Sequence, residues 1–245
     1  MKQFWNQAEH LQWRDFAVVD SAMNRVALVC TGTEKLSKDI LSTCVWIEAR
    51  IDIFLASYSI DSLLPWLTEL RTFSSGNLIG TVRLFSEQCP ARKRFTGKER
   101  YRIFKKIMPF VDLLDIEAMS SLALPMIAEA HNAKKRVIFS YHDFQRTPSN
   151  TRLQRILSFS LKQGADIVKV AARVNNSHDL FRLLSFTFSA SSRNEVVVTP
   201  MGTDPLGRLS PLLFGSLFTY AAFGEPTAPG QLDWKETLSL LQRIK

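Results

Sequence analysis

Short apolar runs alternate with longer amphipathic stretches over most of the chain. The runs are rich in Val, Ile and Leu, which is typical of parallel β-strands buried on both faces. They occupy residues 26–31, 44–51, 78–84, 111–117, 136–141, 166–171 and 195–200, with a weaker run at 218–222. The pattern therefore predicts eight strands.

Apolar residues recur at helical spacing between these runs. The predicted helices cover residues 61–71, 98–108, 122–134, 153–162 and 177–189, and residues 235–245 also have a helical pattern. Alternating strands and helices favour right-handed crossover units on a parallel sheet. We therefore expect an α/β protein with a single (β/α)8 TIM barrel. A doubly wound open sheet is the alternative, but no glycine-rich phosphate-binding turn follows any run.

Composition agrees with one large buried core, since 46% of the 245 residues are hydrophobic. We expect a single barrel domain over residues 1–245, with residues 1–24 as an N-terminal extension. The chain has neither an apolar run of about 18 residues nor the apolar region of a signal peptide, so a cytoplasmic location is predicted. Cys30, Cys44 and Cys89 lack paired spacing, which predicts free thiols and no metal site.

The net charge of +8 raises the question of a nucleic-acid surface. Basic residues are densest over 92–106, where Glu99 interrupts them and no nucleic-acid motif surrounds them. A solvated loop and helix face is the favoured interpretation, with an anionic small substrate as another. We expect no nucleic-acid or membrane partner.

Polar side chains stand at or near the ends of several apolar runs. In a barrel the active site lies at the carboxyl ends of the strands, so these residues are candidates for it. They are Glu48, Arg50 and Asp52 at the second run, Arg83 and Glu87 at the third, Asp115 and Glu117 at the fourth, His142 and Asp143 at the fifth, Lys169 in the sixth, and Arg208 and Gln231 beyond the seventh.

Each candidate taken alone also has a structural explanation. Lys169 is either a buried amine or a side chain that reaches solvent, and His142 is either structural or catalytic. Glu48, Arg50 and Asp52 alternate along one strand face, as a buried ion-pair layer would. Consecutive parallel strands are usually neighbours, so His142 and Lys169 should face one site. Their combination indicates amine and proton chemistry on a carbonyl compound.

The strand ends resemble those of the type I 3-dehydroquinate dehydratases, the Schiff-base-forming enzymes of the shikimate pathway. The resemblance extends from about residue 26 to residue 231. Its motifs are E-x-R-x-D at 48–52, R-x-x-x-E at 83–87, S-Y-H-D-F at 140–144 with T-P at 147–148, K-V-A at 169–171, L-G-R-L-S at 206–210, F-G-S at 214–216, F-T-Y-A at 218–221 and A-P-G-Q at 228–231. Each motif is weak alone, but their order and spacing are specific.

The resemblance implies that the chain converts 3-dehydroquinate to 3-dehydroshikimate in aromatic amino-acid biosynthesis. It implies an imine on Lys169, acid–base catalysis by His142, and Glu87 as the partner of that histidine. Residues implied to bind substrate are Glu48, Arg50, Arg83, Arg208, Thr227 and Gln231, where Thr227 replaces a serine common in relatives. No cofactor is implied, and a homodimer is expected because the family commonly forms one.

The residue types suit these roles. Lysine attacks a ketone only as the neutral amine, and we expect Arg50, Arg83 and Arg208 to favour that form through their positive potential. Histidine exchanges protons near neutral pH, and the planar guanidinium of arginine binds both oxygens of a carboxylate.

The chain departs from the family in two loops. In relatives, two glycines often come after the glutamate of R-x-x-x-E, where this chain has Gln88-Cys89. The second departure is the segment G-T-D-P at 202–205, which precedes Gly207 and Arg208. Another imine-forming barrel, such as a class I aldolase, and a non-catalytic relative that binds a metabolite or partner are the alternative functions.

Overall fold

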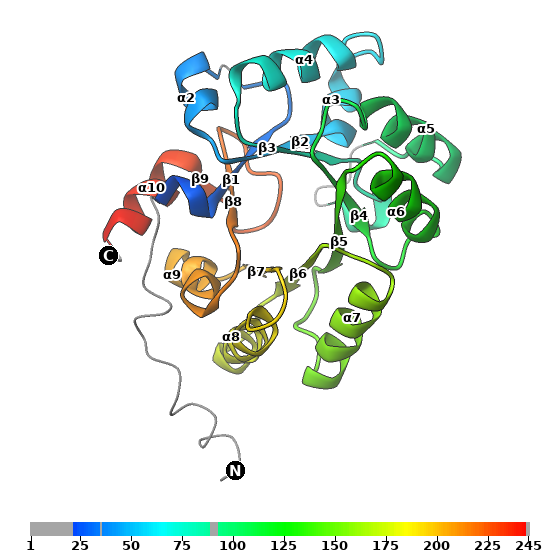
Figure 1. The fold of residues 1–245 in the computed structure, drawn as a ribbon. Coiled ribbons are helices and arrows are strands. Elements are labelled where there is room, and N and C mark those ends of the chain that lie inside the picture. Colours follow the sequence, from blue (N-terminus) through cyan, green and yellow to red (C-terminus); the bar gives the residue numbers. More distant parts are fainter. Residues whose placement is uncertain (1–21, 35, 89–92, 244–245) are drawn as a thin grey trace.

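The eight predicted apolar runs all form strands in the computed structural model, which describes residues 22–34, 36–88 and 93–243. The strands are β1 (Val26–Cys30), β2 (Trp46–Arg50), β3 (Asn77–Thr81), β4 (Leu113–Glu117), β5 (Arg136–Asp143), β6 (Ile167–Arg173), β7 (Val196–Met201) and β8 (Thr219–Ala222). They stand in a ring with the helices around the outside (Figure 1). The predicted α/β barrel class is therefore confirmed.

All the strand pairs of the sheet are parallel, in the order β7-β6-β5-β4-β3-β2-β1-β8-β9 within the described residues. The ninth strand, β9 (Leu232–Asp233), was not predicted and pairs with β8. The amide of Leu217 donates to the carbonyl of Val196 at 2.8 Å, which brings the segment before β8 against β7. The strand order lacks the reversal of a doubly wound sheet, so that alternative is wrong.

The described helices include every one that the sequence predicted. They are α2 (Lys38–Thr43), α3 (Ile51–Ser57), α4 (Leu63–Phe73), α5 (Gly97–Ile107), α6 (Ala123–Asn132), α7 (Asn150–Lys162), α8 (Ser177–Ser191), α9 (Pro205–Leu209) and α10 (Trp234–Arg243), with 3₁₀ helices η2 (Ala22–Arg25), η3 (Phe85–Glu87) and η4 (Ser210–Phe214). Helices α2, α3 and α9 were not predicted. They are short, and a short helix leaves little periodic signal in a sequence.

One local prediction was wrong. Asp52 was expected on a strand face with Glu48 and Arg50, but β2 ends at Arg50 and Asp52 lies in the first turn of α3. The residues from Ile51 to Leu55 are all buried, so their pattern shows neither the period of a strand nor that of a helix.

Successive side chains of each strand face two separate cores. The core inside the ring contains Ala27, Val29, Trp46, Ile79, Leu113, Ile138, Ile167, Val197, Phe218 and Tyr220. The larger core, between strands and helices, contains their neighbours, such as Leu28, Ile47 and Val168. The inside of the ring is therefore packed near the amino ends of the strands.

The inward-facing positions change from apolar to polar toward the carboxyl ends of the strands. On β4, Leu113 is followed two residues later by Asp115, and on β6 Ile167 is followed by Lys169. Trp46 and Glu48 on β2 repeat the order. Because side chains two residues apart share a strand face, the strands carry these ionisable groups into the ring above its apolar floor.

Helix α5 is attached to the ring by Arg100, which is 2% exposed. Its guanidinium forms an ion pair with buried Glu117 and donates to the carbonyl of Val82 at 2.8 and 3.0 Å. Glu117 also accepts the amide of Leu84 at 2.7 Å. Arg100 was counted in the basic stretch over 92–106, but it points inward; Arg92 lies outside the described residues.

Helix length and apolar content also bear on the membrane question. No helix within residues 22–34, 36–88 and 93–243 is long and apolar enough to cross a bilayer.

Two of the three cysteines, Cys30 and Cys44, are buried free thiols, and burial raises the pKa of Cys44 to about 12. Cys89 lies outside the described residues.

We expect Arg100→Met to lower the free energy of unfolding by about 3 kcal/mol, because it leaves Glu117 buried with one cation fewer. Urea denaturation of both proteins measures the difference. Lys105→Met is the matched control on the same helix, since Lys105 pairs with Glu129 on the exposed surface and should leave the midpoint nearly unchanged. Equal midpoints for Arg100→Met and the parent would contradict the prediction.

Candidate active site

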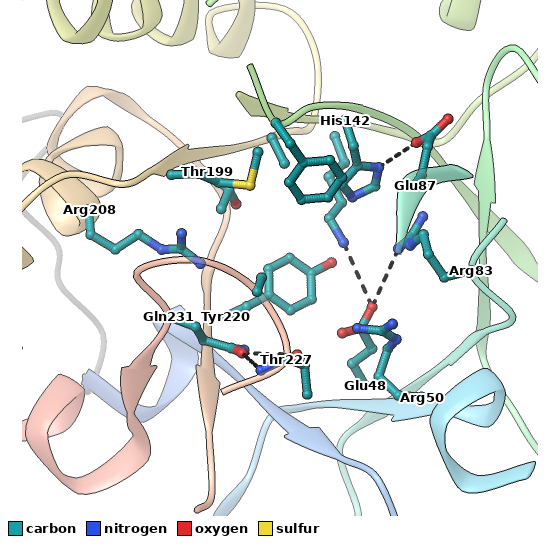
Figure 2. A pocket seen from close by; sticks show the side chains of 15 residues that line it. Glu48, Arg50, Arg83, Glu87, His142, Thr199, Arg208, Tyr220, Thr227 and Gln231 are labelled. Atoms are coloured by element: carbon teal, nitrogen blue, oxygen red, sulfur yellow. Dashed lines mark hydrogen bonds and ion pairs between the residues drawn. The ribbon is translucent and has the colours of Figure 1, made fainter. Parts of the chain in front are cut away.

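One pocket opens at the carboxyl ends of the strands (Figure 2). All nine residues predicted for catalysis or substrate binding line it: Glu48, Arg50, Arg83, Glu87, His142, Lys169, Arg208, Thr227 and Gln231. Sequence reasoning assigned no role to the other lining residues, Phe144, Ala171, Thr199, Met201, Tyr220 and Ala228. The structure thus brings together side chains from five strands, β2, β5, β6, β7 and β8, and from segments that follow strands, such as the one after β3.

Lys169 lies on β6 and is 4% exposed. Its Nζ is 2.9 Å from Oδ2 of Asp115 and 3.7 Å from Oε1 of Glu48. The same nitrogen is 3.9 Å from the centre of the Tyr220 ring. We expected Arg50, Arg83 and Arg208 to supply positive potential here, and the structure also places two carboxylates beside the amine. Both carboxylates therefore lie at ion-pair distance from the amine.

Asp115 lies at the centre of the buried ion pairs and is fully buried. Its oxygens accept from the two Nη atoms of Arg83, both at 2.9 Å, from Ser140 at 2.6 Å and from Lys169 at 2.9 Å. Burial alone would raise the pKa of Asp115, but the charges of Arg83 and Lys169 outweigh it and hold that pKa well below its usual range. Asp115 therefore stays ionised.

His142 and Glu87 form a pair at the opposite end of the pocket from Thr227 (Figure 2). Nδ1 of His142 is 2.8 Å from Oε2 of Glu87, which lies in η3. Burial lowers the pKa of His142 well below its usual value, and the charges of Arg83 and Lys169 lower it further. His142 is thus a neutral imidazole at neutral pH. With Nδ1 bound to Glu87, Nε2 is the nitrogen available to a substrate.

Glu87 titrates near neutrality. Burial, with a contribution from the negative charge of Glu117, raises its pKa to about 7. The positive charge of Arg83 opposes the shift without cancelling it. Because Glu87 can be either ionised or protonated near neutral pH, it can form a hydrogen bond with His142 in either charge state of the imidazole.

Arg50 and Glu48 are held in place by other side chains of the chain. Arg50 forms two hydrogen bonds with Asp52, at 2.8 and 3.1 Å. Glu48 accepts the hydroxyl of Thr81 at 2.8 Å. Both side chains are more than nine-tenths buried, so their orientation is fixed before any ligand binds.

Arg208 is a buried cation that lacks a carboxylate partner within the described ranges. Nη1 donates to the carbonyls of Pro200 at 2.9 Å and Pro229 at 3.4 Å. Burial lowers its pKa to about 10, so it remains charged at neutral pH. A buried, uncompensated guanidinium is unfavourable until an anion binds to it. Arg208 therefore points to a negatively charged ligand.

The unusual segment before Arg208 builds the short helix that carries it. Asp204 caps α9 by accepting the amide of Gly207 at 2.7 Å, and Pro205 occupies its first turn. Gly202 has a φ of +72°, and a Cβ there would lie 2.7 Å from the guanidinium of Arg173. Asp204 and Pro205 therefore begin the short helix that positions Arg208, and Gly202 leaves room for Arg173.

Thr227 and Gln231 form one unit in the loop before β9. Oε1 of Gln231 accepts the amide of Thr227 at 2.7 Å and its hydroxyl at 2.9 Å. The side-chain oxygen of Gln231 is thereby oriented within the loop, and its amide group is the end left for a ligand.

Gln88, one of the departures from the family, bridges its own loop. Its Nε2 donates to the carbonyl of Arg83 and to that of Lys93, both at 3.1 Å. The side chain therefore stabilises the segment that presents Glu87. Its neighbour Cys89 lies outside the described residues.

Sequence reasoning missed Tyr220 as a site residue, and it gave no role to Asp115, which was among its strand-end candidates. Asp115 was recognised as a polar strand end, but nothing in a linear pattern shows that it contacts both Arg83 and Lys169. Tyr220 lies in the weakest apolar run, at 218–222, and sequence reasoning collected no polar strand-end residue there. Its position two residues after Phe218, on the inward face of β8, is the signal that could have found it.

Comparison with known proteins gives the same class of enzyme. The sequence profile of the type I 3-dehydroquinase family matches residues 26–245. The 3-dehydroquinate dehydratase of Thermodesulfovibrio yellowstonii is 32% identical over 222 residues, which cover 89% of this chain and 94% of that protein. The chain belongs to the type I 3-dehydroquinase family.

Solved structures of the family have the same fold. The crystal structure of 3-dehydroquinate dehydratase from Aquifex aeolicus VF5 matches with a TM-score of 0.75 and 28% identity, covering 90% of this chain and 98% of that one. The type I enzyme from Clostridium difficile, with covalently modified comenic acid, matches with a TM-score of 0.75 and 27% identity, covering 92% and 95%.

We expect Glu87→Gln to become more stable relative to the parent as the pH rises from 4.5 to about 7. A folded carboxyl with a raised pKa binds more protons than its unfolded form in this window, so the parent loses stability as it deprotonates. The change in relative free energy of unfolding should reach about 3 kcal/mol. Denaturant unfolding at several pH values measures it, and a constant difference across the window would contradict it.

Proposed function

We propose that the chain dehydrates 3-dehydroquinate to 3-dehydroshikimate through an imine on Lys169. One observation carries the proposal: a single pocket holds a buried lysine, a neutral histidine paired with Glu87, and Arg208 without a carboxylate partner among the described residues. The lysine fits a ketone, the histidine fits proton transfer, and the arginine fits a carboxylate. The substrate 3-dehydroquinate carries a ketone and a carboxylate.

The first half of the reaction forms the imine. The neutral amine of Lys169 attacks the ketone carbon, and the resulting carbinolamine loses the former ketone oxygen as water. The protonated imine that remains draws electrons from the adjacent carbon–hydrogen bond. His142 removes that proton, and the electron pair moves to the imine nitrogen as an enamine.

The second half expels the hydroxyl group. The enamine electrons return and break the carbon–oxygen bond at the β carbon, while His142 gives its proton to the departing oxygen, so that water leaves. A second water then hydrolyses the conjugated imine and releases product and free Lys169. The water consumed in hydrolysis balances the one lost in imine formation, so the net reaction is loss of one water.

His142 can also prepare the nucleophile. Lys169 lies at ion-pair distance from Asp115 and Glu48 and attacks only as the neutral amine, so any proton that it carries must leave first. His142 lines the same pocket and is neutral at neutral pH, so it is the base available for the proton. It then gives that proton to the carbinolamine oxygen, which leaves as water, and is neutral again when it removes the proton from carbon. The carboxylates then stabilise the positive charge when it reappears on the imine nitrogen.

The remaining ligand contacts divide between the two sides of the pocket. We assign the substrate carboxylate to Arg208 and Gln231, which lie on one side in Figure 2. The ring hydroxyls are assigned to Glu48, Arg50 and Arg83 on the other side. Family membership disfavours a class I aldolase, and the inward Arg100 weakens the RNA interpretation. A single barrel domain, a cytoplasmic location and a homodimer stay predictions.

Borohydride reduction in the presence of 3-dehydroquinate should attach a substrate- or product-derived mass to Lys169, because reduction converts an imine into a stable secondary amine. Mass spectrometry of the peptides locates the adduct. Lys169→Met should abolish both adduct and turnover, whereas Lys162→Met, an exposed lysine on α7, should retain both. An active preparation without an adduct on Lys169 would overturn the imine mechanism.

His142→Gln should still form the imine but lose about 10²- to 10⁴-fold in kcat, since it removes the group that transfers protons. Absorbance of the conjugated product gives kcat, and borohydride trapping reports the imine. His178→Gln, an exposed histidine on α8, is the control expected to match the parent. Full turnover in His142→Gln would remove the histidine from the mechanism.

A further inference from the structure

Buried polar atoms without a partner gather at one pocket. Among the described residues, the buried side-chain atoms that lack a hydrogen-bond partner are Arg25 Nε, Ser160 Oγ, Thr199 Oγ1, Arg208 Nε and Tyr220 OH. Thr199, Arg208 and Tyr220 all line the candidate active site. Buried polar groups in folded proteins are nearly always paired, and an unpaired one is costly. Their concentration here indicates that a ligand completes their hydrogen bonding.

Tyr220 is the one of the three that also contacts the reacting nitrogen. It lies on β8, is 5% exposed, and packs edge-to-face on Phe218 with ring centres 5.3 Å apart. The packing fixes the plane of its ring. Nζ of Lys169 lies 3.9 Å from the ring centre, at the distance of a cation–π contact.

The hydroxyl of Tyr220 points into the pocket. Figure 2 shows it directed away from Arg208, toward the side where Glu48 and Arg50 lie. Burial, with the negative charges of Glu48 and Asp115, raises the pKa of Tyr220 well above its usual value, so the hydroxyl keeps its proton. It is therefore a donor.

The hydroxyl of Tyr220 has no hydrogen-bond partner in the chain, and the nearby carboxylates have other donors. Asp115 accepts from Arg83, Ser140 and Lys169. Glu48 accepts from Thr81 and lies near Lys169. The donor of Tyr220 is thus left for an oxygen of a bound molecule.

We propose that Tyr220 takes part in the reaction through two contacts. Its ring face stabilises the positive charge on the nitrogen of Lys169. Its hydroxyl donates a hydrogen bond to a substrate oxygen beside the carbon that this nitrogen attacks. The proposal rests on the imine mechanism above. It assigns a further residue to the reaction, one to which sequence reasoning gave no role.

The ring face supplies something that the carboxylates do not. The nitrogen of Lys169 is positively charged as the ammonium and again as the protonated imine. An aromatic face stabilises a cation through its electron-rich ring, carries no formal charge and has no basic atom to take the proton of the cation. Tyr220 therefore stabilises the imine in its reactive, protonated form.

Two variants separate the two contacts. Tyr220→Phe keeps the ring and removes only the hydroxyl, so kcat/KM should fall about tenfold, as for a lost hydrogen bond in a buried site, while the borohydride-trapped fraction stays near that of the parent. Tyr220→Leu removes the ring as well, so its trapped fraction at saturating 3-dehydroquinate should be about tenfold lower than that of the parent and of Tyr220→Phe. Steady-state kinetics and mass spectrometry measure the two effects.

Stability distinguishes contact with substrate from a structural role. Removing an unpaired buried hydroxyl should leave the melting temperature of Tyr220→Phe equal to or above that of the parent, although its catalysis is weaker. Ser160→Ala is the matched control, because it removes an unpaired buried hydroxyl on α7 outside the pocket and should leave kcat/KM unchanged.

Each outcome bears on one of the claims. Parental kinetics in Tyr220→Phe would overturn the hydroxyl contact, and a parental trapped fraction in Tyr220→Leu would overturn the ring contact. If Tyr220→Leu does not fold, a Tyr220→Phe trapped fraction far below that of the parent would still count against the division of roles. Absence of an adduct in the parent itself would refute the imine mechanism, a result distinct from both.

Discussion

The rest of the site depends on the hydrogen bonds and ion pairs that the buried carboxylate of Asp115 accepts. Ser140 on β5, Lys169 on β6 and Arg83 in the loop after β3 all donate to this one residue inside the ring. Three positive or polar groups could not remain buried together without a negative charge among them. Asp115 therefore holds the side chain of Lys169 in place within the site.

The pocket has two electrostatic halves that perform different tasks. Around Lys169 the charges are closely compensated, since Asp115 and Glu48 lie within ion-pair distance of the amine. On the side of Arg208 the guanidinium donates only to backbone carbonyls of the described chain. A substrate with a carboxylate at one end and a ketone at the other satisfies both halves. The arrangement selects the orientation of the ligand as well as its charge.

Much of the fold was predictable because its signals are local. Each apolar run predicted a strand, and each longer amphipathic stretch predicted a helix, since both patterns depend only on residues close in sequence. The prediction failed at Asp52, where a uniformly buried segment has no period, and at α9, a helix of five residues. Closure of the ring near Leu217 was also beyond a local pattern, because it joins residues of separate elements.

The sequence by itself determined the α/β barrel, the family, and which nine side chains meet at the carboxyl ends of the strands. Strand alternation and motif order are properties of the linear chain. Only the tertiary structure decided that carboxylates, not arginines, lie nearest Lys169, that Arg100 points inward, and that Tyr220 lies against the amine. These facts depend on distances between strands remote in sequence. Charge interactions fall off with distance and depend on burial, and no linear pattern records either.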